Sequence, residues 1–140
     1  MTVIKHEGTA PCPASQFFRL IEHIENYPRF LTWCKDARII NRTPNAIQGS
    51  ALINKYGLRF DCPFTYTLNS KNEIHVSLPS GGPFYAVSGV WRFEDVNNQT
   101  RFSFELHLEH KNSWWMNFIM LPILKNEIKQ VIKSFEQQAK

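Results

Sequence analysis

The sequence predicts an α+β fold in which a curved antiparallel sheet of six or seven strands wraps around one long C-terminal helix. Between residues 37 and 110, apolar and polar side chains alternate for most of the chain, which is typical of strands. Between residues 112 and 139 the apolar spacing changes to three and four, which is typical of a helix. A sheet with one apolar face must cover that face, and this helix is the element large enough to do so.

A strand and a helical elbow precede the sheet. Residues 3–10 are expected to form the first strand, which the Pro11-Cys12-Pro13 stretch ends. Pro13 suits the first turn of a helix, and the Asn26-Tyr27-Pro28 stretch ends that helix. Helical spacing is kept by Phe17, Phe18, Leu20, Ile21 and Ile24. Residues 28–34 are expected to form a second short helical turn.

Six further strands are expected, each with one apolar and one polar face, as in an antiparallel sheet that is exposed to solvent on one side. They cover residues 37–43, 46–55, 58–68, 73–78, 85–94 and 101–110. The clearest alternation sets Phe64 and Tyr66 against Arg59 and Asp61. Turns are expected at residues 56–57, 69–72, 80–83 and 97–100. Such short connections imply a meander.

The long helix has two unlike halves. Its second half is amphipathic, whereas residues 114–124 are apolar nearly all the way round and contain Pro122, which should kink the helix. Consecutive helical residues point about 100° apart, so Trp114, Trp115 and Met116 cannot all face inward. An exposed Trp pair beside lysines suits peripheral contact with a membrane. The alternative is that neighbouring loops cover the outward-facing ring.

Length and composition indicate a single domain, residues 1–140, that buries a core without disulfides or a metal. The chain is rich in aromatics, with 11 Phe and 4 Trp. Its 3 cysteines are widely spaced and no secretory signal is seen, which favours free thiols in a reducing compartment. The longest apolar run falls short of the ~20 residues that a spanning helix needs. We therefore expect a cytoplasmic protein that can touch a membrane from one side.

The net charge of +4 is small but unevenly spread. Between residues 35 and 61 only Asp36 and Asp61 oppose five basic side chains, Lys35, Arg38, Arg42, Lys55 and Arg59. This patch suits anionic lipid headgroups or RNA phosphates. A solvated surface that keeps the protein soluble is the alternative. DNA is not expected as a partner.

Signals for catalysis are weak. The 5 histidines are scattered, without the spacing of a metal-binding motif, and His75 and His107 fall on wet strand faces. Neither a nucleophile elbow nor a Gly-rich phosphate loop is present. We expect no enzyme activity, no metal and no required cofactor. A single buried Glu or His acting as a general acid or base, as a cyclase would need, stays open.

A curved sheet and one helix rarely fit closely along their whole length, so a hydrophobic cavity is expected between them. Trp91 is the first ligand-binding candidate, because Gly89 leaves room beside its ring for a flat headgroup. Pro83 and Phe84 would form a lip at the mouth of this cavity, or merely a tight connection between two strands. The further lining candidates are Trp33, Phe60, Phe64, Tyr66, Phe104, Phe118 and Leu121. Core packing is the alternative for the strand aromatics among them, and for Trp33 the alternative is that it only fixes the elbow to the sheet.

Three blocks of the sequence, in the same order, resemble a known family over essentially the whole chain. The first block is residues 17–34. The second is Gly82-Pro83-Phe84 followed by Val87, Gly89 and Trp91-Arg92-Phe93. The third is Phe135-Glu136 with Ala139. The family is the START-like coenzyme-Q-binding and ribosome association toxin family of the SRPBCC superfamily, often labelled polyketide cyclase/dehydrase-like. The resemblance implies a helix-grip (START/Bet v 1-like) fold. Thr32 and Gly81 depart from the family pattern.

The resemblance implies two unlike activities. The first is non-catalytic binding of ubiquinone or a related polyprenyl lipid, which supports respiratory electron transfer and would place the protein at the inner membrane. The second is that of a ribosome association toxin, which binds the large ribosomal subunit and blocks subunit association. The five basic side chains between residues 35 and 59 would make that contact. A polyketide cyclase-type enzyme ranks third.

Overall fold

The computed structural model describes residues 2–55, 58–70, 72–78, 84–111, 113–114 and 116–139. The side chains of Lys55, Leu58, Phe60, Asn69, Phe84, Met116 and Met120 are outside this description. The sheet is antiparallel, with the order β1-β7-β6-β5-β4-β3-β2. Its strands are β1 (Thr2–Ala10), β2 (Cys34–Arg42), β3 (Ala46–Lys55), β4 (Leu58–Ser70), β5 (Glu73–Leu78), β6 (Phe84–Val96) and β7 (Gln99–His110).

The strands from β2 to β7 form the predicted meander, and β1 returns to pair with β7 along its whole length, from Thr2↔Leu108 to Ala10↔Thr100. The β6–β7 turn has Asn97 and Asn98 at φ 54° and 66°, the left-handed geometry of a tight hairpin turn. The α+β fold and its seven-stranded sheet are thus confirmed.

The elbow after β1 consists of α1 (Ala14–Glu22) and a 3₁₀ turn, η1 (Ile24–Arg29). Pro13 precedes α1 and supplies no side-chain cap, so the Ala14 amide instead donates to Asp95 Oδ1 at 2.7 Å. The second helical turn expected at residues 28–34 was placed wrongly. The turn begins at Ile24 because Ile24 and Tyr27 are both buried, and β2 already begins at Cys34.

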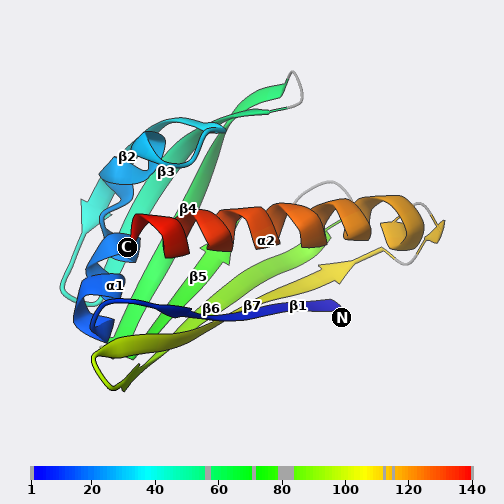
Figure 1. Ribbon diagram of the computed structural model, residues 1–140. Helices are drawn as coiled ribbons and strands as arrows, with labels where there is room; N and C mark the ends of the chain where they lie inside the picture. Colours follow the sequence, from blue (N-terminus) through cyan, green and yellow to red (C-terminus); the bar gives the residue numbers. More distant parts are fainter. Residues whose placement is uncertain are drawn as a thin grey trace.

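The C-terminal helix crosses the concave face of the sheet and ends beside α1 (Figure 1). A π-helical turn, η2 (Met116–Met120), leads into α2 (Leu121–Gln138). The prediction of one α-helix from residue 112 with a kink at Pro122 was therefore wrong in detail, because Pro122 lies in the first turn of α2. A proline has no amide to donate and its ring collides with the carbonyl four residues earlier. The wider π turn is where the helix accommodates both effects.

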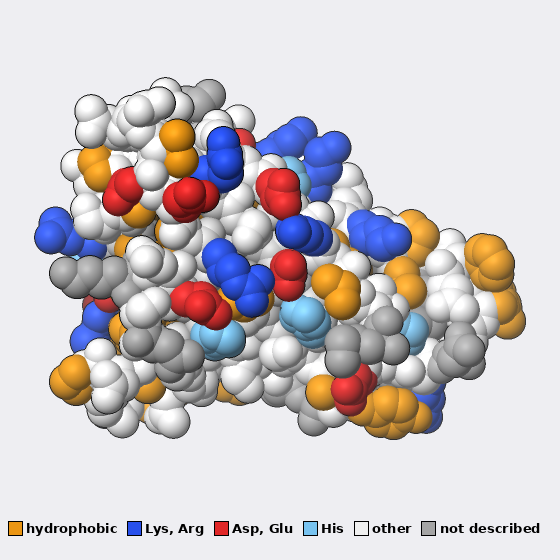
Figure 2. All heavy atoms as spheres, turned by 90° about the horizontal axis from the view of Figure 1, so that it is seen from below, with side chains coloured by type: hydrophobic (Ala, Val, Ile, Leu, Met, Phe, Trp, Pro, Cys, Tyr) orange, Lys and Arg blue, Asp and Glu red, His pale blue; other side chains and the backbone are white. Residues whose placement is uncertain are grey.

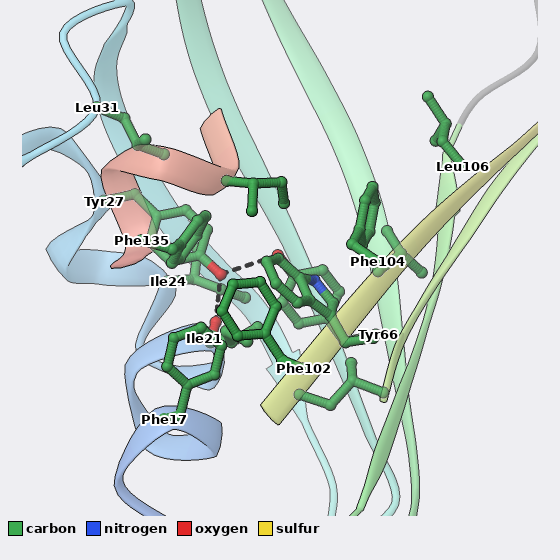
Figure 3. Packing of buried hydrophobic residues seen from close by; sticks show 14 of the residues in the cluster. Phe17, Ile21, Ile24, Tyr27, Leu31, Tyr66, Phe102, Phe104, Leu106 and Phe135 are labelled. Carbon is green, nitrogen blue, oxygen red and sulfur yellow. Dashed lines mark hydrogen bonds between the residues drawn. The ribbon is translucent and has the colours of Figure 1, made fainter. Parts of the chain in front are cut away.

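The core lies between the sheet, the elbow and the second half of α2 (Figure 3). Phe17 on α1 stacks on Phe102 with ring centroids 4.8 Å apart, and Phe135 on α2 meets Tyr27 at 5.3 Å. Aromatic rings at such distances contribute beyond the area that they bury. The elbow and the end of α2 are thereby fixed to one end of the sheet.

Candidate ligand-binding site

The space between α2 and the sheet is closed at the end where α1 lies. Trp91 is only 3% exposed there. Its ring centroid lies 4.8 Å from that of Phe104 and 5.5 Å from that of Phe135. The strand face predicted for Trp91 is therefore an inner face, and the ring is held by β7 and α2.

Gly89, the neighbour that was expected to leave room beside Trp91, is covered by another ring. A Cβ atom at Gly89 would lie 2.9 Å from Phe104 Cζ and 3.3 Å from the Glu105 carbonyl oxygen. The glycine is thus needed for close packing against β7. Phe104 occupies the position expected for a headgroup.

The other end of the same apolar surface is only half-buried. Leu78 and Val87 are opposite each other on β5 and β6, four residues along from the buried pair Ile74 and Trp91. Phe64 on β4 is half-buried as well, and so are three residues of α2, Leu124, Ile128 and Val131. Water therefore reaches an apolar surface that a closed core would bury, at a cost of ~25 cal/mol for each Å² left wet.

A hollow of about 340 Å³ lies between α2 and the edge strand β1. It is lined by Val3, Ile4, Lys5, His6, Lys125, Ile128 and Lys129. Its volume is at the lower end of the range for small-molecule pockets. Two further hollows lie elsewhere, one of about 330 Å³ across β2 to β5 and one of about 260 Å³ beside α1.

A chain of hydrogen bonds joins the elbow to the sheet at the closed end. The Tyr27 hydroxyl donates to the Ile21 carbonyl, and the Tyr66 hydroxyl lies 2.9 Å from Tyr27 Oη (Figure 3). Burial raises the pKa of Tyr66 to about 12, and burial also raises the pKa of Tyr27 well above its usual value. Both phenols are therefore neutral at physiological pH.

The predicted lining residues are divided between core and surface. Tyr66, Phe104 and Leu121 are buried, and Trp33 is half-buried where its carbonyl accepts the Asn54 amide at 2.8 Å. Phe118, in contrast, is 75% exposed. Pro83 and the side chains of Phe60 and Phe84 lie outside the described residues.

The predicted basic patch is split by a bulge in β2. Arg38 lies 3.7 Å from Asp61 across to β4, and Arg59 is exposed on the same strand as that carboxylate. A register shift between Ile39 and Asn41 reverses the alternation. Arg42 consequently reaches α1, where its guanidinium lies 3.9 Å from Glu22. Lys35 is exposed, and the side chain of Lys55 is outside the described part of the chain.

The titratable side chains in the described ranges form no metal cluster, since no three of His, Cys, Asp and Glu gather there in a way that would hold an ion. His75 and His107 instead contact Glu73 and Glu105 on their own strands. Cys12, Cys34 and Cys62 are free, and burial raises the pKa of each thiol. Such thiols carry little thiolate at neutral pH.

Sequence reasoning missed Leu78, Val87 and the α2 residues as the open part of the site. Alternation does place Val87 on the face of Trp91, and the helical period does put Leu124 and Ile128 on one side of α2. Neither pattern gives the distance between the helix and the sheet, which decides whether an apolar residue is buried or partly exposed to solvent.

These features define the class of the protein: a helix-grip protein with an apolar inner surface that is closed at one end and open at the other. The chain belongs to the family described as polyketide cyclase / dehydrase and lipid transport, whose model matches residues 10–136. Within the described residues no helix is both long and apolar enough to cross a bilayer.

Several curated proteins are similar to the chain. It is 29% identical to the persistence and stress-resistance toxin PasT of Escherichia coli O6:H1, over 80% of this chain and 71% of that protein. It is 28% identical to the ribosome association toxin RatA of Escherichia coli K12, with the same coverage. RatA of Pseudomonas aeruginosa is 22% identical, over 99% of this chain and 96% of that protein.

Solved structures show the same fold. TTHA0849 from Thermus thermophilus superposes with a TM-score of 0.82 at 15% identity, covering 99% of this chain and 97% of that one. A START superfamily protein from Mycobacterium smegmatis gives 0.78 at 16% identity, with 98% and 96% covered. The di-domain aromatase/cyclase BexL gives 0.81 at 15% identity, covering 98% of this chain and 46% of that one.

Proposed function

We propose that this chain is a non-catalytic binder of a hydrophobic small molecule, held between α2 and the inner face of the sheet. The observation that carries the proposal is that apolar side chains on both sides of this space are only half-buried, Leu78 and Val87 on the sheet and Ile128 on α2. A ligand that enters there buries both itself and these walls, which supplies affinity without any polar group. Trp91 and Phe104 would form the inner end of its path.

The ligand class we propose is ubiquinone or a related polyprenyl lipid, in a role that supports respiratory electron transfer. The proposal is supported by the family's description, which includes lipid transport, and by the resemblance in three sequence blocks. A long isoprenoid chain needs an apolar surface that is open at one end, because its tail is longer than a compact pocket. A protein of this kind would be peripheral to the inner membrane, with Trp114 as a contact. Trp115, the second predicted contact residue, lies outside the described residues.

Lipid extraction tests this function. The protein is purified from its native host, extracted with organic solvent and examined by mass spectrometry, and the stripped protein is offered ubiquinone. Val87→Trp should fill the open part of the space and reduce uptake at least tenfold. Ser88→Trp is the matched control, since Ser88 is exposed on the opposite face of the same strand. Absence of any bound lipid together with absence of uptake would refute the proposal.

Ribosome association is the second candidate, favoured by the names of the RatA relatives. The surface for it would be Lys35, Arg38 and Arg59 on the outer side of β2 and β4. Phosphate contacts make such binding steeply dependent on salt. Arg38→Gln with Arg59→Gln should weaken co-sedimentation with large ribosomal subunits at low salt, whereas Arg101→Gln, an exposed arginine on β7, should not. A wild-type protein that stays in the supernatant at low salt would exclude this function.

An enzyme of the cyclase type is the third candidate and rests on family membership alone. The acid or base that it needs would have to face the inner surface. Buried polar groups described there include the hydroxyls of Tyr27, Tyr66 and Thr100, all engaged in hydrogen bonds, and the Cys34 thiol, whose pKa is raised by burial. We therefore place binding ahead of catalysis.

A further inference from the structure

The helical segment at the start of α2 carries its apolar residues on the outside. Trp114 is 68% exposed and Phe118 is 75% exposed. Ile119 and Ile123 are 40% and 46% exposed, and Pro122 between them is exposed too. We call Trp114, Phe118, Ile119 and Ile123 the apolar tip. A surface helix normally turns polar residues to water, so the pattern is reversed here.

The apolar character of the exposed face ends within one helical turn after Ile123. From Lys125 onward the exposed positions of α2 are polar, among them Asn126, Lys129, Gln130 and Lys133. One helix thus has an apolar outer face at its start and a polar outer face along the rest. A general excess of hydrophobic residues would not produce such a boundary, so the apolar tip is a local feature of the fold.

The apolar tip projects from the molecule. In Figure 1 the start of the helix extends past the strands at the end opposite α1. Figure 2 shows hydrophobic side chains gathered at that same end, with Lys and Arg side chains beside them. Tyr85, at the start of β6, is 62% exposed, and β6 begins where Phe84 pairs with His110. A tyrosine therefore lies close to where the chain enters the tip.

Lysines border the apolar tip on both sides. Lys111 precedes it and Lys125 follows it, with Lys129 one turn further along. Among the described residues none of these three ammonium groups has a carboxylate within 4 Å. Of the nearby acidic residues, Glu109 is exposed and Glu127 has an interaction partner of its own.

Two of these lysines also line the hollow of about 340 Å³ between β1 and α2. The floor of that hollow is apolar at Ile4 and Ile128. Lys5 is already held by Glu7 at 3.0 Å, and His6 lies 3.4 Å from Glu136. Lys125 and Lys129 are the remaining cationic side chains of this hollow that can meet an anion. Apolar side chains next to two ammonium groups that have no carboxylate within 4 Å among the described residues match the boundary between the acyl chains and the phosphates of a lipid.

We infer that the apolar tip and the hollow beside it form one docking surface for an anionic phospholipid bilayer. Trp114, Phe118 and Ile123 enter the interface at headgroup depth, where indole and phenyl rings are favoured. Lys111, Lys125 and Lys129 meet lipid phosphates. The open end of the apolar space is thereby turned toward the membrane. Docking itself does not depend on which small molecule the chain binds.

Vesicle flotation tests the inference with the full chain. Vesicles of equal parts phosphatidylcholine and phosphatidylglycerol should carry the protein, and vesicles of phosphatidylcholine alone should carry much less. Trp114→Ser with Phe118→Ser should weaken binding at least tenfold. Ile40→Ser is the matched control, because Ile40 is 62% exposed on β2, away from the tip. Equal flotation of all three proteins would overturn the inference.

The charge contribution is tested separately. Each lysine near an anionic surface contributes about fivefold to binding. Lys125→Gln and Lys129→Gln should each weaken flotation by that factor, and added salt should remove the difference. Lys35→Gln on β2 is the control. Concentration-dependent self-association that Phe118→Ser abolishes, without vesicle binding by the wild type, would show a protein interface instead and overturn the inference.

Failure here is distinguishable from failure of the proposed function. Ubiquinone delivered in detergent reports ligand binding, whereas ubiquinone delivered in vesicles reports docking as well. The double variant Trp114→Ser with Phe118→Ser should take up ligand normally from detergent and poorly from anionic vesicles. Normal uptake from vesicles by this variant would contradict docking and leave ligand binding intact.

Discussion

The hydroxyl oxygens of Tyr27 and Tyr66 lie 2.9 Å apart in the core, although the two residues come from the elbow and from β4. Because the single proton of Tyr27 is donated to the Ile21 carbonyl, Tyr66 is the donor within the pair. The two phenols are thus not equivalent. Tyr27 both accepts and donates, whereas Tyr66 only donates to its partner.

This asymmetry predicts that substituting the two tyrosines lowers the free energy of unfolding by unequal amounts. Tyr27→Phe leaves the Tyr66 hydroxyl buried without an acceptor and should cost about 1–3 kcal/mol in the free energy of unfolding. Tyr66→Phe keeps the bond from Tyr27 to Ile21 and should cost about 1 kcal/mol or less. The double variant should cost less than the sum of the two. Urea unfolding of the four proteins measures this, and equal losses would contradict the assigned direction.

The same pair predicts a loss of stability at high pH. Burial raises the pKa of Tyr66 from 10.0 to about 12, so the folded state favours the neutral phenol. Its contribution is complete below pH 10 and is lost as the pH rises from 10 to about 12. Phenolate absorbance should therefore appear late for the buried pair, and unfolding free energy should fall in that window. The fall should be smaller in Tyr66→Phe and unchanged in Tyr85→Phe.

Asp95 caps α1 across 81 residues of sequence, with the Ala14 amide 2.7 Å from its Oδ1. Asp95→Ala should therefore lower the unfolding free energy by about 1 kcal/mol, a typical loss for a helix cap. Asp95→Asn keeps an acceptor oxygen and should lose less. Glu94→Ala, which changes the exposed residue before it, is the control. An Asp95→Ala protein with unchanged stability would show that the bond is not formed in solution.

Gly89 should tolerate no side chain while Phe104 is present. A Cβ atom there meets the Phe104 ring at 2.9 Å, so Gly89→Val should destabilise the protein by about 1–3 kcal/mol through overpacking. Adding Phe104→Leu should recover part of the loss, because the smaller side chain vacates the contact. Thermal unfolding of the single and double variants measures the recovery. Strictly additive losses would show that Phe104 is not what excludes the side chain.

The strands and their wet and dry faces were predictable because alternation along each strand is a local property. Tyr66 and Phe104, for example, were assigned to the inner face from neighbouring residues alone. The 3₁₀ turn at Ile24 and the π turn before Pro122 were missed. The first depends on the burial of Ile24 and Tyr27 against other elements. The second was missed because Pro122 was expected to kink an α-helix, whereas the helix instead widens into a π turn before it.

The site was less predictable than the fold. A sequence identifies which residues face inward but does not say how far the opposite wall lies from them. Trp91 and Val87 share one face of β6, yet the first is buried by Phe135 and the second is half-buried below a more open part of α2. The bulge that turns Arg42 toward Glu22 was likewise unseen, because it adds one residue without any sequence signal.

The division of α2 into a closed and an open part has a consequence for how the family can change. Substitutions at Ile132 or Phe135 disturb the packed end and endanger folding, since both side chains are almost fully buried. Substitutions at Leu78, Val87 or Ile128 should affect folding less, because these side chains are only half-buried. Under the proposed function, different ligands can therefore be accommodated at one end of the helix, while the other end preserves the fold.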